Sequence, residues 1–426
     1  MSLLGTPLVV ILAVAAVLLP VATFLLWGRV RGPRPVRAGA RLGMLGAGQV
    51  ATLLLVAALA NDYGQFYTSW GDLVGSPGGG ISIRTYGGLA PSSASSPWQP
   101  RPHHTPTAQP PALRIQPASV PSGKRGASGQ LQVLGNTSWS TRSQWATKGK
   151  VEQVRITGLG SGLSELGYVY LPPQYFQAKY AHRSFPAVET IGGYPGTALA
   201  QVTRMNYPGV SQQLVGQHRS TPMVFVMLSS VVAPPRDTEG TNIPGGPQAE
   251  TYFAREVPSA VQSALRVTPH DWGISGDSTG GYIATKVLMH HPQTFAGAVS
   301  LSGYYHALSD VTTGNLWGGS LAVKHANDPE WLLAHRAAPP VSLFVTITKQ
   351  ENSNTEGYAD TMKFVHEVKP PMRVTAMVLD NGGHNFNTWG RELPTALTWL
   401  SHRLGLPRHI APAPAHSAAG APHSAR

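Results

Sequence analysis

Ser278 lies in a G-x-S-x-G pattern that ends a short apolar run and opens a helical one. A serine on such a strand-to-helix turn, a nucleophile elbow, is exposed at the edge of a sheet, and the glycines permit the tight turn. No Walker lysine and no G-x-G-x-x-G follow, which disfavours a phosphate-binding loop. The pattern predicts a nucleophilic serine, and the alternative is a solvated serine in a glycine-rich turn.

A serine hydroxyl is a weak nucleophile near neutral pH, so a histidine must take its proton. In proteins with a nucleophile elbow, this histidine follows the nucleophile and the acid in the chain. This order narrows the choice among the 16 histidines of the sequence. His384 follows an apolar strand pattern and precedes the last amphipathic helix pattern, and we predict that it is the base. The other histidines in or beside helical patterns are expected to be surface or capping residues: His290, His291, His325, His335, His366 and His402.

The carboxylate that orients the histidine is expected on the loop after the penultimate strand. Residues 342–347 form that strand pattern and lead directly to Glu351, our first candidate. Glu356 and Asp360 lie slightly further along the chain, and Asp380 lies just before the histidine. Each of these could instead be a solvated charge at the start of a helix, so several candidates for the acid remain.

A tetrahedral intermediate requires two backbone N–H donors, one of which comes from the residue after the nucleophile. Thr279 occupies that position. The second donor is expected on the loop after an earlier strand, and the strand pattern at residues 187–191 runs into the small residues around Tyr194. We therefore predict an oxyanion hole formed by Tyr194 and Thr279, with a plain β-turn around Tyr194 as the alternative.

The sequence lacks the residues for several other chemistries. It contains no cysteine, which excludes disulfides, thiolate zinc sites and cysteine nucleophiles and leaves the redox compartment open. It contains no H-E-x-x-H motif, and the doublets His103-His104 and His290-His291 lack suitably spaced partners. We expect no metal ion.

From about residue 150 to residue 404, apolar strand-like runs alternate with helical ones. This alternation predicts one α/β domain, with a mostly parallel central sheet and helices on both faces. In the last helix pattern, Leu393, Leu397, Leu400 and Leu404 share one apolar face. The predicted strands cover residues 151–157, 166–171, 187–191, 223–228, 272–275, 298–302, 342–347 and 373–379.

Two long apolar runs, residues 8–27 and residues 42–60, lie near the N-terminus. Each approaches or reaches the length of about 20 residues that spans a bilayer. The short segment between them carries five arginines, and such loops stay on the cytoplasmic side. The pattern predicts a two-helix transmembrane hairpin with all that follows outside the cytoplasm. A cleaved signal peptide for the first run and a buried soluble helix for the second are the alternatives.

The remaining segments are rich in Gly, Pro, Ser and Ala. We divide the chain into the hairpin at residues 1–62, a linker at 63–130, the α/β-hydrolase domain at 131–406 and a disordered tail at 407–426. The linker is expected to be a flexible tether that lets the domain work away from the bilayer.

The formal net charge of +12 raises the question of an anionic partner. Apart from the arginines between the apolar runs, the basic residues are scattered, without a basic stripe interleaved with aromatic residues. This distribution argues against nucleic-acid binding.

Residues 191–196, 276–281, 295–305 and 382–389 together resemble the putative esterase family of α/β-hydrolases, which includes esterase D and actinobacterial mycolyltransferases. The resemblance covers roughly residues 150–404, and Ser302–Tyr305 with Trp389 are its more specific parts. It implies ester hydrolysis or acyl transfer through an acyl-serine without a cofactor, using Ser278, His384 and the Tyr194/Thr279 hole. In the mycolyltransferases the acid lies further into the following helix, which would favour a position near Glu367.

Three hypotheses about function follow. The first is an extracytoplasmic serine esterase that acts on ester or lipid-like small molecules at the cell membrane. The second is an acyltransferase that passes the acyl group to a sugar or lipid hydroxyl. The third is a surface protein that kept the hydrolase fold without catalysis. The bias toward arginine, alanine, glycine and proline, together with the hairpin, resembles actinobacterial cell-envelope proteins.

Overall fold

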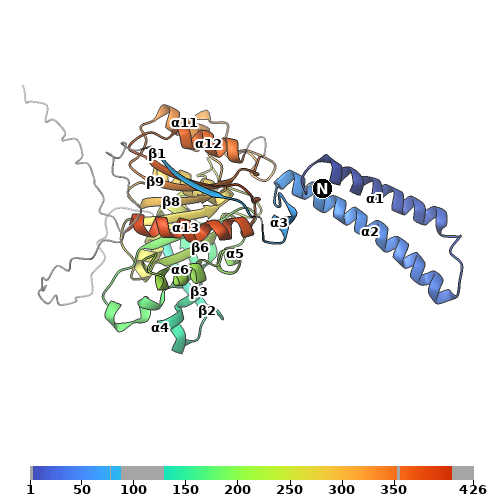
Figure 1. Cartoon of the computed structure of the whole chain (residues 1–426). Helices are drawn as coiled ribbons and strands as arrows, with labels where there is room; N and C mark the ends of the chain where they lie inside the picture. The colour runs from blue at the N-terminus through green and yellow to red at the C-terminus, as the bar shows by residue number, and fades with distance from the viewer. Residues whose placement is uncertain (1–2, 77, 88–128, 353–355, 405–426) are drawn as a thin grey trace, which may run out of the picture.

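The computed structural model describes residues 3–76, 78–87, 129–352 and 356–404. It contains an α/β domain and a helical hairpin that projects from one end of it (Figure 1). The domain is built on a 10-stranded sheet in the order β1-β10-β9-β8-β7-β5-β6-β4-β3-β2. The strands are β1 (Ile81–Gly87), β2 (Gly129–Asn136), β3 (Lys150–Gly158), β4 (Ser164–Leu171), β5 (Ala187–Gly192), β6 (Val224–Ser229), β7 (Trp272–Asp277), β8 (Phe295–Leu301), β9 (Ser342–Thr348) and β10 (Arg373–Leu379).

The centre of the sheet is parallel, from β10 through β9, β8, β7 and β5 to β6. Antiparallel strands complete both edges: β1 beside β10, and β4, β3 and β2 beyond β6. Strand order reverses beside β5, because β6 pairs on one side of it and β7 on the other. In open α/β sheets, ligands bind at the carboxyl ends of strands at such a switch point.

Helices cover both faces of the sheet, as the alternating sequence pattern predicts. The helices are α1 (Thr6–Leu26), α2 (Arg34–Gly64), α3 (Trp70–Leu73), α4 (Trp145–Lys148), α5 (Ala198–Thr203), α6 (Tyr207–Gly216), α7 (Ala249–Thr251), α8 (Val257–Ala264), α9 (Thr279–His290), α10 (Leu321–Ala326), α11 (Pro329–His335), α12 (Tyr358–Glu367) and α13 (Phe386–Leu404). Short helical turns lie at Arg142–Gln144, Pro173–Phe176, Ala178–Tyr180 and Tyr252–Glu256.

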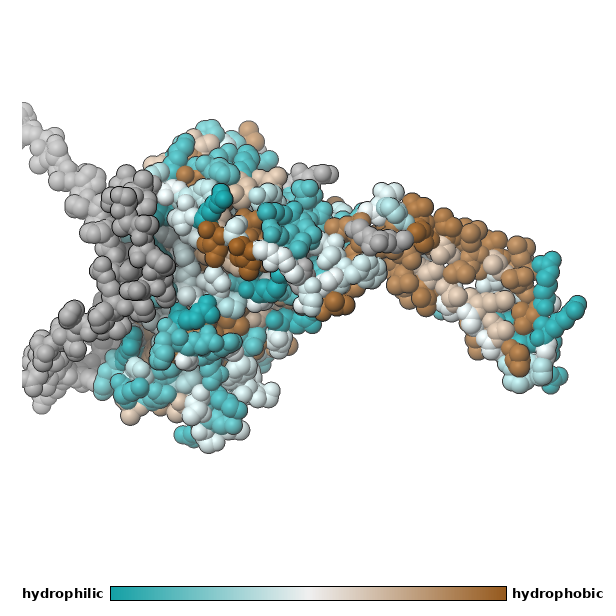
Figure 2. Space-filling view, in the orientation of Figure 1, coloured by the Kyte–Doolittle hydropathy of each residue, from teal (hydrophilic) through white to brown (hydrophobic). Residues whose placement is uncertain are grey.

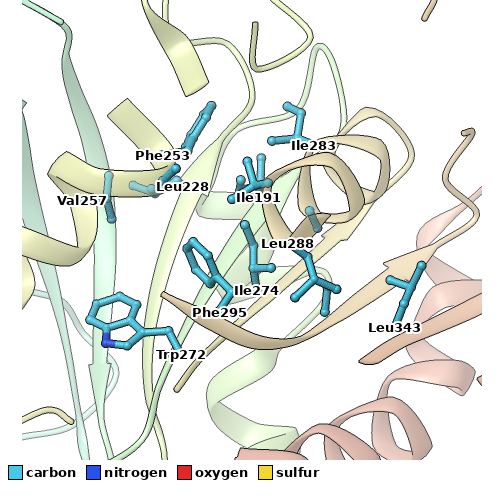
Figure 3. Close-up of a cluster of buried hydrophobic side chains, with 14 of the residues drawn as sticks. Ile191, Leu228, Phe253, Val257, Trp272, Ile274, Ile283, Leu288, Phe295 and Leu343 are labelled. Atoms are coloured by element: carbon cyan, nitrogen blue, oxygen red, sulfur yellow. The ribbon is translucent and has the colours of Figure 1, made fainter. Parts of the chain in front are cut away.

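Two apolar cores separate these helices from the sheet. Under α8 and α9, side chains such as Val257, Leu288 and Ile274 pack together (Figure 3). On the opposite face, α6 and α13 cover the sheet through residues such as Leu214 and Leu393. The predicted α/β-hydrolase fold is thereby confirmed, and the eight predicted strands all exist, with boundaries within three residues of the prediction.

The predicted linker is partly wrong, because it contains one strand of the sheet and the first residues of another. Residues 81–87 form β1, which pairs along its whole length with β10, and β2 begins at Gly129. The two strands lie at opposite edges of the sheet. The Pro/Gly/Ser-rich segment therefore connects two edges of one domain and does not separate the domain from the hairpin. Most of it, residues 88–128, and the predicted tail lie outside the described residues.

The start of the predicted linker, residues 63–76, joins the hairpin to the domain by direct contact. Helix α2 ends where Gln65 adopts a left-handed conformation with φ 49°, and the next residues lie against the loop that carries His384. The side chain of Asn61 fixes this turn through two hydrogen bonds to the backbone of Tyr67, of 2.8 and 2.9 Å. The domain is held at the end of α2, contrary to the expected free tether.

The hairpin consists of α1 and α2, packed through small residues. A Cβ at Gly48 would lie 3.3 Å from Pro20 of α1, so the glycine permits the helices to approach closely. Both helices are long and apolar enough to cross a membrane. Figure 2 shows an almost continuous hydrophobic surface along the hairpin, with hydrophilic residues at the tip far from the domain. Near that tip, the guanidinium of Arg41 lies 4.8 Å from the ring centre of Trp27.

Candidate active site

The five residues singled out by the sequence meet at the carboxyl ends of neighbouring parallel strands. Tyr194 follows β5, Ser278 and Thr279 follow β7, Glu351 follows β9 and His384 follows β10. Since parallel strands all end at the same edge of the sheet, this topology places the side chains on one side of the molecule. The strand order, with its reversal beside β5, brings the first of these loops next to the elbow after β7.

The turn at Ser278 is strained in the way that an elbow requires. Ser278 has φ 54° and ψ −125°, a conformation that residues with a side chain rarely adopt. The glycines on either side permit this turn, because a Cβ on Gly276 would lie 2.2 Å from Gly280 and a Cβ on Gly280 would lie 1.9 Å from the carbonyl oxygen of Ile191. Helix α9 begins at the next residue and holds the serine at its N-terminus.

Ser278, His384 and Glu351 form a continuous chain of hydrogen bonds. Nδ1 of His384 lies 2.8 Å from Oε2 of Glu351, and Nε2 lies 2.8 Å from Oγ of Ser278. Because a carboxylate only accepts, Nδ1 carries the proton and donates it to Glu351. Nε2 then has a free lone pair and accepts the hydrogen bond that the serine hydroxyl donates. This is the arrangement that activates a serine nucleophile.

The carboxylate of Glu351 is itself held in place. The residue is 4% exposed, and its Oε1 accepts hydrogen bonds from the hydroxyl of Ser302 at 2.9 Å and from the backbone N–H of Thr348 at 3.3 Å. Ser302 is the residue after β8 and Thr348 is the last residue of β9, so the acid is fixed by the strand that carries it and by the end of the neighbouring strand. Oε2 is left to orient the histidine.

The electrostatic environment favours the protonated form of His384. Burial alone would lower the pKa of this imidazole, but the hydrogen bond to Glu351 and the negative charges of Glu351, Glu356 and Asp277 outweigh it. The net effect raises the pKa of His384 above its usual value near 6.5. A raised pKa makes the imidazole a stronger acceptor for the serine proton.

Of the other candidates for the acid, Glu356 lines a cavity together with Ser278 and His384, and the rest lie elsewhere. Asp360 faces His306, whose Nδ1 is 3.3 Å away, and Asp380 pairs with Lys349 at 2.7 Å on the surface. Glu367, which the resemblance to mycolyltransferases favoured, is the last residue of α12, while the loop that faces His384 precedes the start of that helix. Glu351 is the candidate whose carboxylate lies 2.8 Å from Nδ1 of His384.

The two predicted oxyanion donors both lie near Ser278. Thr279 is the first residue of α9, so its N–H has no acceptor within the helix. Tyr194 follows β5 and lines two cavities together with Ser278. Asp277, fully buried behind the serine, accepts hydrogen bonds from the N–H of Gly193 at 3.0 Å and from the side chain of Gln201 at 2.9 Å.

Sequence reasoning missed Asp277, Ser302 and the segment after α2 as parts of this site. The backbone N–H of His384 donates to the carbonyl oxygen of Gln65 at 3.1 Å. Asp72, which is 0% exposed, accepts hydrogen bonds from Asn385. A hint was present in the two glycines before the histidine: a Cβ on Gly383 would lie 2.4 Å from the carbonyl oxygen of Phe66.

Ser278 lines a cavity of about 560 Å³, which we call the polar cavity. It is bounded by the end of the hairpin on one side and by the loop after β9 on the other. Its lining combines catalytic candidates with residues of both segments: Asp62, Gln65, Phe66, Tyr194, Ser278, Ser302, Glu351, Asn352, Glu356 and His384.

The histidine doublet within the described residues does not contribute to this site. His290 and His291 at the end of α9 both contact Oε1 of Glu250, each at 2.9 Å. His103-His104 lie outside the described residues. Within the described ranges, no cluster of three or more histidine and acidic side chains has the arrangement of a metal site.

The fold and the elbow define an α/β-hydrolase. The S-formylglutathione hydrolase of Agrobacterium tumefaciens has a similar structure, with a TM-score of 0.53, 16% sequence identity, and coverage of 64% of this chain and 100% of that one. A fluorophosphonate-binding serine hydrolase of Staphylococcus aureus aligns over 59% of this chain and 98% of its own, with 18% identity and a TM-score of 0.48. The first similarity shows the fold.

The family is shown by the sequence. The family model described as "Putative esterase" matches residues 166–400, more than half of the chain, and the chain belongs to this family. Membership confirms the predicted resemblance and the predicted enzyme class, a serine hydrolase. An uncharacterized protein of Corynebacterium glutamicum is 22% identical over 256 residues, and the match covers 56% of this chain and 57% of that relative.

Proposed function

We propose that this protein is a membrane-anchored serine esterase that cleaves carboxylic esters through an acyl-serine intermediate on the extracytoplasmic side. The observation that carries the proposal is the Ser278–His384–Glu351 chain, with both hydrogen bonds at 2.8 Å. A solvated serine in a glycine-rich turn would not be expected to lie within hydrogen-bond distance of a histidine 106 positions away that is itself oriented by a buried carboxylate.

In the first half of the reaction, Oγ of Ser278 attacks the carbonyl carbon of the ester while Nε2 of His384 takes the hydroxyl proton. The carbonyl electron pair moves onto oxygen, where the N–H groups of Tyr194 and Thr279 stabilise the negative charge. The imidazolium, stabilised by Glu351, then gives its proton to the alcohol oxygen as the carbon–oxygen bond breaks. The alcohol leaves, and the acyl group remains on Ser278.

In the second half, a water molecule takes the place of the alcohol. His384 removes one of its protons as the water oxygen attacks the acyl carbon, and the same donors stabilise the second oxyanion. The bond to Oγ breaks, Ser278 recovers its proton from His384, and the carboxylic acid leaves. The cycle uses only groups of this chain and water.

The N-terminal hairpin supports the proposed location. Its two apolar helices are joined by a turn at residues 27–33, and arginines occupy this turn and the start of α2. A short positively charged connection is retained in the cytoplasm, so both outer ends of the hairpin face the other side. Since the domain lies at the end of α2, it would stand directly on the extracytoplasmic surface.

The proposal is tested on the full-length chain in detergent or nanodiscs with a fluorophosphonate, which forms a covalent adduct with an activated serine. We expect the adduct on Ser278, and we expect Ser278→Ala to lose both labelling and hydrolysis of p-nitrophenyl acetate. Ser143→Ala, which removes an exposed hydroxyl, is the matched control and should retain both. An unlabelled Ser278 in a folded protein, or a Ser278→Ala variant with full esterase activity, would exclude the proposed mechanism.

A further inference from the structure

A second cavity, of about 740 Å³, reaches Ser278 from the hairpin and is called here the hairpin groove. Its inner end is lined by Ser278, His384 and Trp389. Its outer part is lined by apolar residues of both membrane helices, among them Leu12 of α1 and Leu54 of α2. The site therefore has an apolar extension built by residues outside the α/β domain.

The hairpin groove follows the hairpin toward its apolar middle. Leu54 precedes the end of α2 at Gly64 by ten residues, a rise of about 15 Å along a helix. Its side chain is 51% exposed, and the neighbouring surface of the hairpin is hydrophobic (Figure 2). If α1 and α2 span a bilayer, this part of the groove lies at the depth of lipid hydrocarbon.

Ser278 lies at the level where the span ends. Gln65, the residue after α2, accepts the hydrogen bond from the backbone of His384, so no further chain separates the helix from the site. Phe66 and Trp70 follow, 46% and 53% exposed, as aromatic residues commonly do at a membrane–water interface. A lipid could place its ester group at Ser278 while its acyl chain stays in an apolar environment.

The polar cavity and the hairpin groove meet at the serine, since both are lined by Phe66, Tyr194, Ser278 and His384. The polar cavity would receive the alcohol part of an ester. Its lining carries three carboxylates and, among the described residues, no lysine or arginine: Asp62, Glu351 and Glu356. An anionic alcohol part would meet like charges there, whereas an uncharged one would not.

We propose that the hairpin groove binds the acyl chain of a membrane-lipid ester with an uncharged alcohol part, which reaches Ser278 sideways from the bilayer. The two membrane helices are then part of the substrate site as well as an anchor. This inference rests on the proposed function. The acyl carbon–oxygen bond breaks as described above, the acyl group passes to Ser278, and the protonated alcohol leaves through the polar cavity.

The first test blocks the groove in the full-length chain in nanodiscs. Ala57 is exposed and lines the groove, so Ala57→Trp should lower the ratio of kcat/KM for dioleoylglycerol to that for p-nitrophenyl acetate at least tenfold. Val56→Trp, which introduces the same ring at an adjacent exposed residue outside the lining, is the matched control and should leave the ratio unchanged. Dioleoylphosphatidylglycerol should be cleaved at least tenfold more slowly than dioleoylglycerol.

The second test does not depend on a variant. A long-chain fluorophosphonate with a photoreactive group at the end of its chain is attached to Ser278 of the wild type and then irradiated. We expect crosslinks to α1 or α2 between Leu8 and Leu12 or between Leu54 and Asn61.

The outcomes separate the inference from the function on which it rests. Three results would overturn the proposal that the hairpin groove binds an acyl chain and leave the proposed esterase function intact. They are crosslinks confined to the α/β domain, an unchanged ratio in Ala57→Trp, and a wild type that cleaves only the acetate. If the wild type cleaves dioleoylphosphatidylglycerol as fast as dioleoylglycerol, the proposed preference for an uncharged alcohol part is overturned. A wild type that neither cleaves the acetate nor reacts with the fluorophosphonate would overturn the esterase itself.

Discussion

Asp72 and Asn385 join the segment after the N-terminal hairpin to the loop that carries His384. Nδ2 of Asn385 lies 3.1 Å from Oδ2 and 3.3 Å from Oδ1 of Asp72, across 313 positions of the sequence. Both side chains are buried, and Oδ2 of Asp72 also accepts the backbone N–H of Thr68 at 3.1 Å. The adjacent residue, His384, is thereby held by a segment that lies outside the family match.

We predict that Asp72→Ala lowers kcat about tenfold to a hundredfold with little change in KM. The substitution removes the buried carboxylate that Asn385 contacts and leaves its amide only the carbonyl oxygen of Phe66 as an acceptor on this segment. His384 is then less often aligned with Ser278, and each tenfold loss corresponds to about 1.4 kcal/mol. Steady-state kinetics with p-nitrophenyl acetate measure the effect, and the variant should keep its thermal unfolding transition. Asp380→Asn, which alters an exposed carboxylate, is the control. A kcat equal to that of the wild type would refute the positioning role.

The strands that sequence patterns predicted are those buried in the sheet. Residues 342–347, for example, are buried in β9 and mostly apolar, so their composition reflects their position. β1 was missed because it is an exposed edge strand that follows a glycine-rich segment, and its place is set by pairing with β10. The contact between Asp72 and Asn385 was also missed because it joins distant segments, and such polar contacts leave no periodicity in the sequence.

We predict that kcat/KM rises with pH and reaches half its plateau value above pH 6.5. The base must be neutral, so the rate follows the fraction of His384 that has lost its proton. Because Glu351 and the neighbouring acidic groups raise the pKa of His384, this fraction becomes large only above the usual histidine range. A pH–rate profile of the wild type between about pH 5 and pH 9 measures it. A half-point below 6.5 would contradict the described environment.

Glu351→Gln is expected to lower kcat by about three to four orders of magnitude, as loss of the orienting carboxylate does in serine proteases. It should also move the half-point of the pH profile downward, because burial then dominates once the charge and the hydrogen bond to Glu351 are lost. Asp360→Asn, at a candidate that faces His306 instead, should change neither quantity. The opposite pattern would show that Asp360 is the acid.

The three polar groups of the site differed in how well the sequence predicted them. Ser278 and His384 carry local signatures, the strained elbow and the glycines before the histidine, because close backbone approach restricts side chains there. Glu351 has no signature of its own and was chosen only by its place after a strand. Asp277 lies inside the elbow motif, yet its role depends on Gly193 and Gln201, which sequence reasoning could not place beside it.

Asp277→Asn is predicted to lower kcat about tenfold. The carboxylate accepts one hydrogen bond on each oxygen, from Gly193 and from Gln201, and an amide can accept only one of them. The backbone beside Tyr194 is then less well fixed, and the oxyanion donor moves with it. The loss should appear in kcat for p-nitrophenyl acetate while fluorophosphonate still labels Ser278. If kcat stays at the wild-type value, Asp277 does not fix the donor.

Glu392 provides a test of stability away from the reacting atoms. It is fully buried on α13, and one of its oxygens accepts a hydrogen bond from Thr346 at 2.6 Å. Burial raises the pKa of this carboxyl from 4.5 to about 8, with the hydrogen bond from Thr346 opposing the shift and the charge of Glu351 adding to it. Between these two values the folded state keeps a proton that the unfolded state has released, so stability falls as pH rises.

Glu392→Gln should therefore gain stability relative to the wild type as the pH increases. The amide is neutral in both states and can still accept the hydrogen bond from Thr346, so the penalty of ionising a buried acid disappears. Thermal unfolding of both proteins, followed from about pH 5 to about pH 8, should show a difference in Tm that grows with pH in favour of the variant. A difference that stays constant over this window would mean that Glu392 ionises alike in both states.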